Sequence, residues 1–336
     1  MTTICRHRLF LLLPLLLVAA RLDAQERESV DLHGLQERLP RAMGASSGDA
    51  FGILSPGRLL VKFDGGALSA DHYYGVASEL RRFDTNGTSY TRLFARPSVR
   101  YGLFDRFDLS LELPLTYERL TSAERFPERS IGRLASVDLG AGWGALQFFS
   151  SNDTAITSRT SIAVRGRLSI PTGFHNGLDN DPKHPSFLDD GALEGELGLA
   201  GVYVTPELEI GGRVGYRMRG EELEDEIPWS LSIDLTRIRG AAIGVGAFGA
   251  VSVADPSHPS RPFYAGSSGT AAEQTEIDGG RGIFRRPDRE TYAGIHAGVT
   301  VDLGDTWSLG AHYGVRLVGT NALGMSGAWL TVGYRN

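Results

Sequence analysis

From about residue 58 to residue 335, the chain consists of strand-length segments in which every second residue is apolar or aromatic. In the segment 107–117, the odd positions are Phe, Leu, Leu, Leu, Leu and Tyr, whereas the even positions are Asp, Ser, Glu, Pro and Thr. Side chains alternate between two faces every two residues in a β-strand, while a helix would mix these sets on each face. The segments 207–218 and 306–318 alternate in the same way. The pattern predicts an all-β protein.

Alternation alone fits a soluble sandwich or a membrane barrel with its apolar face toward lipid, and the connections separate the two. Short turns are predicted near 104–106, 150–153, 205–207, 237–240 and 304–305. Between them lie longer connections at 118–132, 171–190, 219–227 and 254–289, with tighter ones at 84–87 and 320–324. This interleaving puts the tight turns at one end, as on the periplasmic side of outer-membrane barrels. The sequence therefore predicts a transmembrane antiparallel up-and-down β-barrel.

The barrel is expected to have about twelve strands, an even number that places both of its ends in the periplasm. The predicted strands are 68–83, 88–104, 107–117, 133–149, 155–170, 191–204, 207–218, 228–237, 241–253, 290–303, 306–318 and 325–335. The segment 58–64 also alternates, so a longer first strand with a bulge at Gly65 and Gly66 is an alternative. This alternative leaves the strand count open by about two.

Aromatic residues near the ends of predicted strands are typical of the two lipid–water interfaces of a membrane barrel. The residues interpreted in this way are Tyr101, Phe107, Tyr117, Trp143, Phe149, Tyr203, Trp229, Tyr292, Trp307 and Tyr334. The opposite face of the strands is rich in Gly, Ser and Thr with scattered charges, which suits the wall of a curved barrel.

The N-terminus predicts export. Arg6 and Arg8 precede the apolar run 9–20, which is too short to span a bilayer as a helix, and Ala24 suits a cleavage site. Residues 1–24 are therefore interpreted as a signal peptide, which contains Cys5, the one cysteine of the chain. An exported chain without disulfides favours the bacterial periplasm or outer membrane. The net charge of −6 gives no basic face for nucleic acid, so no nucleic-acid partner is expected.

Residues 25–56 precede the predicted barrel, which is taken as 57–336. Leu32, Leu35, Leu39 and Met43 have near-helical spacing, so this segment is a candidate for a plug that enters the lumen from the periplasm. The alternative is a disordered or surface-lying leader, which the glycines and charges of the segment favour.

Charged residues at inward positions of the strands are the candidates for lining the lumen. They are Arg92, Arg96, Arg100, Asp108, Glu112, Asp138, Arg165, Arg167, Glu194, Glu196, Arg213, Arg217, Asp234, His296, Asp302, His312 and Arg316. The mixed signs indicate cross-strand pairing. Two interpretations stay open: a polar path that selects permeants by charge and size, and an ion-pair network that fills a narrow barrel.

The connection 171–190 is the candidate for a metal site. It holds Asp179, Asp181, Asp189 and Asp190, whose oxygens suit calcium, but their spacing matches no complete calcium loop. A solvated extracellular loop is the alternative, and neither a metal nor another cofactor is expected.

Two stretches carry a resemblance to a known family. Arg100-Tyr-Gly-Leu-Phe-Asp-Arg-Phe-Asp-Leu-Ser-Leu-Glu-Leu-Pro-Leu115 and Leu168-Ser-Ile-Pro-Thr-Gly173 resemble the outer-membrane proteins labelled as a MetA-pathway of phenol degradation, and related barrels. The likeness extends over about 58–335 and implies a channel or transporter for small hydrophobic, often aromatic, compounds.

These observations together predict an outer-membrane channel for small, hydrophobic or aromatic molecules. The expected partners are outer-membrane lipids, the barrel-assembly machinery during biogenesis, and a small hydrophobic solute. One alternative is a structural or surface-interaction barrel without transport. A lipid hydrolase embedded in the barrel is the other, but Ser308 and His312 are predicted to face the lumen and are too far apart along their strand, so no enzyme is expected.

Overall fold

The structure is a computed structural model. It describes residues 52–74, 78, 80–82, 89–121, 129–134, 136–151, 156–171, 193–219, 225–238, 240–253, 291–320 and 322–336. The secondary structure of these residues is entirely β. In this part of the chain, no helix is long and apolar enough to cross a membrane.

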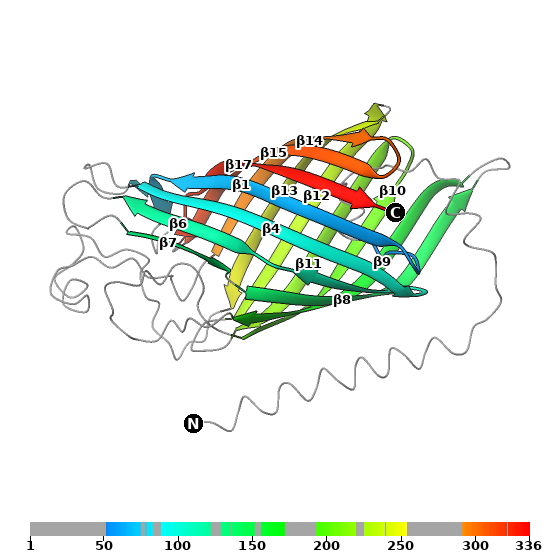
Figure 1. The fold of residues 1–336 in the computed structure, drawn as a ribbon, viewed down its shortest axis with the longest axis horizontal. Coiled ribbons are helices and arrows are strands. Elements are labelled where there is room, and N and C mark those ends of the chain that lie inside the picture. Colours follow the sequence, from blue (N-terminus) through cyan, green and yellow to red (C-terminus); the bar gives the residue numbers. More distant parts are fainter. Residues whose placement is uncertain are drawn as a thin grey trace, which may run out of the picture. The chain divides into compact units, whose positions relative to one another are not determined.

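The strands form one large antiparallel sheet, shown in Figure 1, and one small sheet. The strands of the large sheet are β1 (Leu59–Ala70), β4 (Ser89–Phe104), β5 (Phe107–Glu112), β6 (Leu115–Thr121), β7 (Arg129–Leu134), β8 (Ser136–Ser151), β9 (Ile156–Pro171), β10 (Glu194–Val204), β11 (Leu208–Arg219), β12 (Asp225–Ile238), β13 (Ala241–Val253), β14 (Thr291–Leu303), β15 (Trp307–Thr320) and β17 (Ser326–Arg335). The small sheet contains β2 (His72–Tyr74), β3 (Leu80–Arg82) and β16 (Ala322–Leu323).

Two pairs of elements, β5 with β6 and β7 with β8, are each parts of a single barrel strand. β5 and β6 pair with two successive parts of β4, and β8 and β7 continue the sheet from them. The break between β5 and β6 falls at Leu113 and Pro114, where proline has no N–H to donate to a neighbouring strand. Counted in this way, the barrel has twelve strands, as the sequence predicts.

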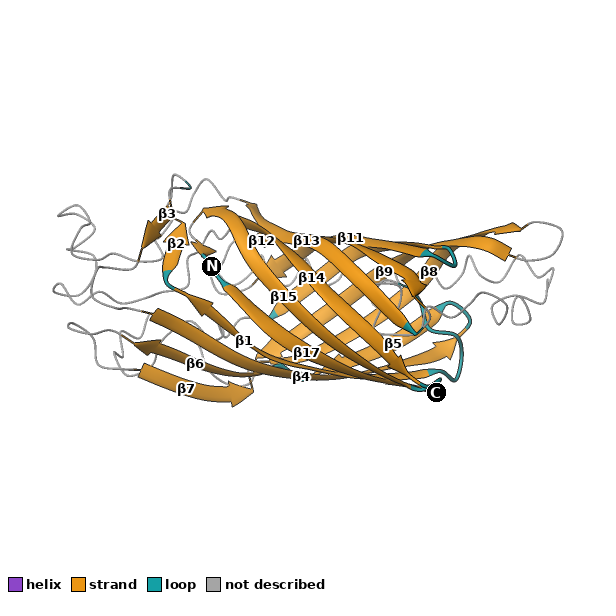
Figure 2. Ribbon diagram, turned by 90° about the horizontal axis from the view of Figure 1, so that it is seen from above, coloured by secondary structure: helices purple, strands orange, loops and turns teal. Residues whose placement is uncertain are grey.

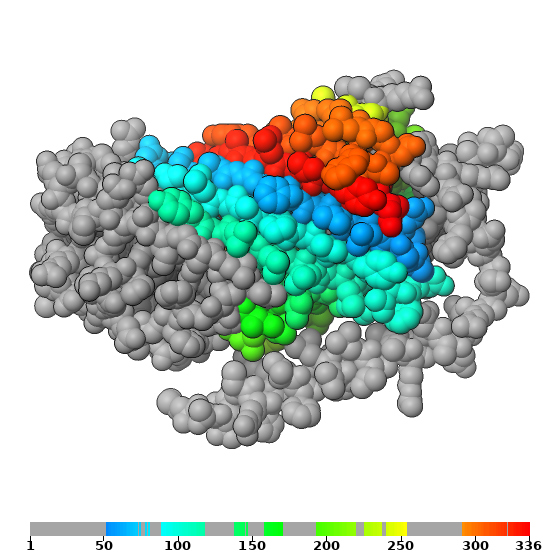
Figure 3. All heavy atoms as spheres, in the orientation of Figure 1, coloured from blue at the N-terminus to red at the C-terminus, as the bar shows by residue number. Residues whose placement is uncertain are grey.

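The barrel closes between its first and last strands. β1 pairs with β4 on one side and with β17 on the other, in an unbroken register from Leu60 opposite Arg335 to Ser69 opposite Ser326. Figure 3 shows β1 in blue directly between β4 in cyan and β17 in red. At the end of this seam, the Leu59 N–H donates to Asn336 Oδ1 at 2.7 Å. The antiparallel closed barrel confirms the predicted fold class.

The boundaries of the first strand differ from the prediction. β1 spans 59–70 and not 68–83, and its register with β4 runs through Gly65 and Gly66 without a bulge. Twelve extended residues are enough to cross a bilayer when tilted. The chain then leaves the barrel: β2 and β3 pair with each other, and β2 pairs with β16, in the small sheet visible at one end in Figure 2.

Short turns gather at the end of the barrel where β1 begins and β17 ends, which we call the turn end. Gly240 and Gly304 lie in the β12–β13 and β14–β15 turns, with φ of +74° and +76°. These left-handed values strain residues with a Cβ, so glycine suits both turns. The Arg335 N–H donates to the Thr306 carbonyl at 2.8 Å, which joins the last strand to this end. The rule for outer-membrane barrels predicts that the turn end faces the periplasm.

The outer face of the barrel is apolar. On β17, Leu330 is 58% exposed, whereas the neighbouring Thr331 is 2% exposed. The same alternation leaves large apolar side chains uncovered on the outside of most of the other strands. An uncovered apolar surface of this extent is stable in lipid but not in water, which agrees with a barrel that spans a membrane.

We expect Leu330→Arg to destabilise the barrel by about 2–4 kcal/mol, because it places a charge on the lipid-facing surface near mid-depth. The matched control is Leu303→Arg at the turn end, also on the outer face at 56% exposed, with an expected cost of about 0–1 kcal/mol. Equilibrium unfolding in urea, in lipid vesicles, measures both. Equal losses at the two positions would contradict a membrane-spanning outer face.

Candidate functional site

The inner face of the barrel holds the candidate site. The strand register places all of the predicted lumen residues on this face, since each pairs with inward positions of the adjacent strands. For example, Arg167, Glu196, Arg217 and Glu226 lie opposite one another on four successive strands. The inner side chains then form three groups, each on a different part of the wall.

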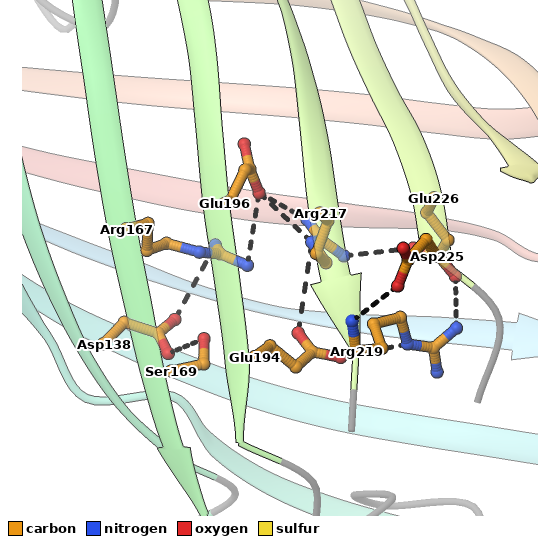
Figure 4. A network of polar contacts seen from close by, with 9 residues as sticks. All are labelled: Asp138, Arg167, Ser169, Glu194, Glu196, Arg217, Arg219, Asp225 and Glu226. Carbon is orange, nitrogen blue, oxygen red and sulfur yellow. Dashed lines mark hydrogen bonds and ion pairs between the residues drawn. The ribbon is translucent and has the colours of Figure 1, made fainter. Parts of the chain in front are cut away.

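The first group, the charged wall, lies on β8 to β12 (Figure 4). We define it as Asp138, Arg167, Glu194, Glu196, Arg217, Arg219 and Glu226. Arg217 is central: its guanidinium lies 2.9 Å from a Glu196 oxygen, 3.2 Å from one of Glu226 and 3.9 Å from one of Glu194. Because one arginine contacts three carboxylates, the wall acts as one electrostatic unit.

Arg167 and Arg219 extend the charged wall in both directions. Arg167 lies 3.7 Å from an Asp138 oxygen and 3.8 Å from one of Glu196, and Asp138 also accepts the Ser169 hydroxyl at 2.5 Å. Arg219 lies 3.1 Å from a Glu194 oxygen and 2.6 Å from one of Glu226. Ion pairs therefore link five adjacent strands from inside the barrel.

The sequence prediction missed Arg219 and Glu226. It ended one strand at 218 and began the next at 228, whereas β11 runs to Arg219 and β12 begins at Asp225. Glu226 has the same parity as the inward positions of β12, Pro228 and Ser230, so extending the alternation two residues backward would have found it.

The second group, the turn-end cluster, consists of Arg100, Asp108 and Arg165. The Asp108 carboxylate is fully buried and pairs with Arg100, while Arg165 lies 3.4 Å from its other oxygen. The Leu54 N–H donates to Asp108 at 3.0 Å, and both arginines donate to the Gly52 carbonyl. The cluster therefore holds the chain that precedes β1 against the inner face.

Residues 52–55 fit this position because glycines of the wall leave space for them. A Cβ on Gly142 would lie 2.8 Å from the Ile53 side chain, and one on Gly102 would overlap the Ser55 backbone. Of the leader predicted as 25–56, residues 52–56 are described and their first four lie along the wall. The rest of the leader and the signal peptide are outside the described residues, and their roles stay predictions.

The third group, the aromatic wall, lies on β13, β14, β15 and β17. We define it as Phe248, Tyr292, His296, His312 and Trp329. His312 stacks on Trp329 with ring centroids 5.3 Å apart, and His296 lies 6.2 Å from both Trp329 and Phe248. Phe248 also contacts Tyr292 at 6.4 Å.

Only the two histidines of the aromatic wall were among the predicted lumen residues. Tyr292 was interpreted as a lipid-interface residue, but its register partner is the buried Ala250 and the Arg316 guanidinium lies 3.7 Å from its ring centre, so it faces inward. Phe248 and Trp329 share the inward parity of their strands, which is the signal that would have identified them.

A cavity of about 220 Å³ adjoins the aromatic wall. Its lining comes from strands on both sides of the seam and from Met325. The lining residues are Leu68, Arg92, Phe94, Arg96, Pro114, Thr116, Phe248, Gly314, Val315, Arg316, Met325 and Trp329.

Two other sequence candidates have different outcomes. Asp179, Asp181, Asp189 and Asp190 lie outside the described residues, and within those residues no group of three or more His, Cys, Asp or Glu side chains could hold a metal ion. His312, considered for a hydrolase, has its ring stacked on Trp329, and Ser308 lies four residues away on the same strand.

The sequence matches no family model and no curated protein. Among solved structures, it is similar to the COG4313 outer membrane channel from Pseudomonas putida F1, with a TM-score of 0.58, 14% identity and coverage of 86% of this chain and 98% of that chain. The KdgM porin in complex with disordered oligogalacturonate follows with a TM-score of 0.42, 10% identity and coverage of 82% and 98%. Identities this low show a similarity of fold alone. From its likeness to the COG4313 channel, the chain has the fold of an outer-membrane β-barrel.

We expect Asp108→Ala to lower the free energy of unfolding by about 3–5 kcal/mol, because it leaves buried Arg100 without its carboxylate and the Leu54 N–H without its acceptor. The control Asp105→Ala changes an exposed carboxylate in the adjacent turn and should stay within about 0.5 kcal/mol of the wild type. Urea unfolding in detergent micelles, followed by tryptophan fluorescence, compares them. A loss below about 1 kcal/mol at Asp108 would contradict its role in holding residues 52–55.

Proposed function

We propose that the protein is an outer-membrane channel for small molecules. The observation that carries the proposal is the inner face of the closed barrel, which is charged and contains a cavity of about 220 Å³, while the outer face is apolar. Such a barrel encloses a polar route through an apolar layer, which is the basic requirement for passive passage across a membrane.

The dimensions favour small permeants. A barrel of twelve strands leaves a narrow interior, and the charged wall and residues 52–55 occupy part of it. Within this class, we propose hydrophobic or aromatic molecules. The resemblance to the MetA-pathway family supports this choice, and so does the aromatic wall, which offers ring surfaces to a passing solute.

The second candidate is a sealed structural barrel. The charged wall favours it, since ion pairs that link five strands from inside stabilise a closed wall and obstruct the lumen. In either case the outer face implies outer-membrane lipids as partners, and biogenesis of the barrel implies the barrel-assembly machinery. For neither candidate do we propose an enzymatic activity.

We expect discrete conductance steps when the refolded protein is incorporated into planar lipid bilayers. Heat-modifiable mobility on gels verifies that the protein is folded. If the folded protein never conducts, this result contradicts an open channel and favours the sealed barrel. Uptake of small aromatic solutes into vesicles containing the protein tests the finer proposal separately.

Arg217→Ala should shift the selectivity of the channel toward cations. The substitution leaves Glu194, Glu196 and Glu226 with less positive charge around them, so the lumen becomes more negative. The reversal potential across a KCl gradient measures the shift. The control is Arg58→Ala, which removes an exposed arginine at the turn end. An equal shift of the reversal potential in both variants would show that the charged wall does not face the permeation path.

A further inference from the structure

The lumenal cavity combines positive charge with aromatic surface. Arg92, Arg96 and Arg316 contribute guanidinium groups, and Phe94, Phe248 and Trp329 contribute rings. None of the described residues that line it is acidic. This composition differs from the charged wall, where carboxylates surround each arginine.

The three arginines differ in how far their guanidinium groups are engaged by other protein groups. Arg316 lies against the Tyr292 ring and donates to the Leu323 carbonyl at 3.3 Å, so its guanidinium is held by the protein. Arg92 lies opposite Glu118 in the register of β4 and β6. Arg96 is exposed on the inner face, with its guanidinium 4.9 Å from the Phe94 ring centre.

Arg96 has no ion pair among the described residues. Asp64 is its register partner on β1, but the Asp64 carboxylate accepts the Thr331 hydroxyl at 2.6 Å. The Arg96 guanidinium therefore presents its donors to the cavity. A carboxylate matches this planar group well, because two of its N–H donors can bond both oxygens at once.

The aromatic surface of the cavity is formed before any ligand enters. Trp329 is stacked on His312 and also contacts His296, which fixes the plane of its indole. A Cβ on Gly314 would lie 3.2 Å from this ring, so glycine allows the indole to lie close to β15. A fixed ring binds another ring with little loss of side-chain entropy.

The size of the cavity, which is partly open, favours a small ligand. At about 220 Å³ it is smaller than the pockets of about 300–1,000 Å³ that enclose drug-sized molecules. A single aromatic ring with a small substituent is the class of ligand that suits this volume.

We propose that the cavity binds a small aromatic carboxylate, with its ring against Trp329 and Phe248 and its carboxylate paired with Arg96. This inference rests on the proposed channel and narrows its permeants from hydrophobic or aromatic molecules to anionic aromatic ones. The barrel then has a selective binding site within its lumen, on the other side of the circumference from the charged wall.

Isothermal titration of the folded full-length mature protein in detergent micelles tests the ligand class without depending on conductance. The probes are benzoate, benzyl alcohol, which has a ring without a charge, and cyclohexanecarboxylate, which has a charge without an aromatic ring. We expect benzoate to bind about tenfold more tightly than either analogue. Equal affinity for benzoate and benzyl alcohol would overturn the anionic part, and equal affinity for the two carboxylates would overturn the aromatic part.

Substitutions test the position of the site. Arg96→Gln should weaken benzoate binding about tenfold and leave benzyl alcohol unchanged, whereas Trp329→Leu should weaken both. The matched control Arg159→Gln changes an arginine of β9 that does not line the cavity, and it should bind benzoate like the wild type. An unchanged affinity in Arg96→Gln, or an equal loss in the control, would overturn the proposed site. Heat-modifiable gel mobility confirms the fold of each variant.

The two proposals fail in different ways. A protein that conducts ions but does not bind benzoate retains the channel and overturns this inference. If the protein binds benzoate but neither conducts nor takes up solutes, the binding site stands and the channel does not.

Discussion

The seam between β1 and β17 is the interaction on which the rest of the structure depends. In a bilayer, an unpaired strand edge exposes N–H and C=O groups to hydrocarbon, where no water can bond them. β1 pairs along both of its edges, with β4 and with β17, so neither the first nor the last strand of the barrel is left as an open edge. Every inward side chain owes its position to this closure, because register fixes which residues face the lumen.

Closure into a small circle also explains how the interior is divided. Large side chains inside a narrow barrel require small residues beside them, and glycine supplies these: Gly142 makes room for Ile53 of the segment before β1, and Gly314 for Trp329 of β17. Charged side chains gather on β8 to β12, where Arg167, Arg217 and Arg219 each contact carboxylates, and rings gather on β13, β14, β15 and β17. The lumen therefore offers a polar surface and an aromatic surface on different sides of one narrow space.

Alternation and turn lengths were enough to predict the fold, the number of strands and the parity of the lumen residues, because these properties are local. What sequence reasoning missed depends on partners that are distant in the chain. The first strand could not be placed without knowing that β17 lies beside 60–69, and Glu226 was hidden by a boundary error of three residues at Asp225. Asp108 and the Leu54 N–H that it accepts are 54 residues apart in the chain, and no pattern in either segment indicates that they pair.

The contacts that keep residues 52–55 against the inner face also relate this segment to the closing strand. Leu54 is five residues ahead of Leu59, where β1 begins, so pairing β1 with both of its neighbours brings this segment within reach of Asp108. The strand that closes the wall therefore carries, directly ahead of it, the segment that narrows the barrel at the turn end. Closure and constriction are encoded in one continuous stretch of chain.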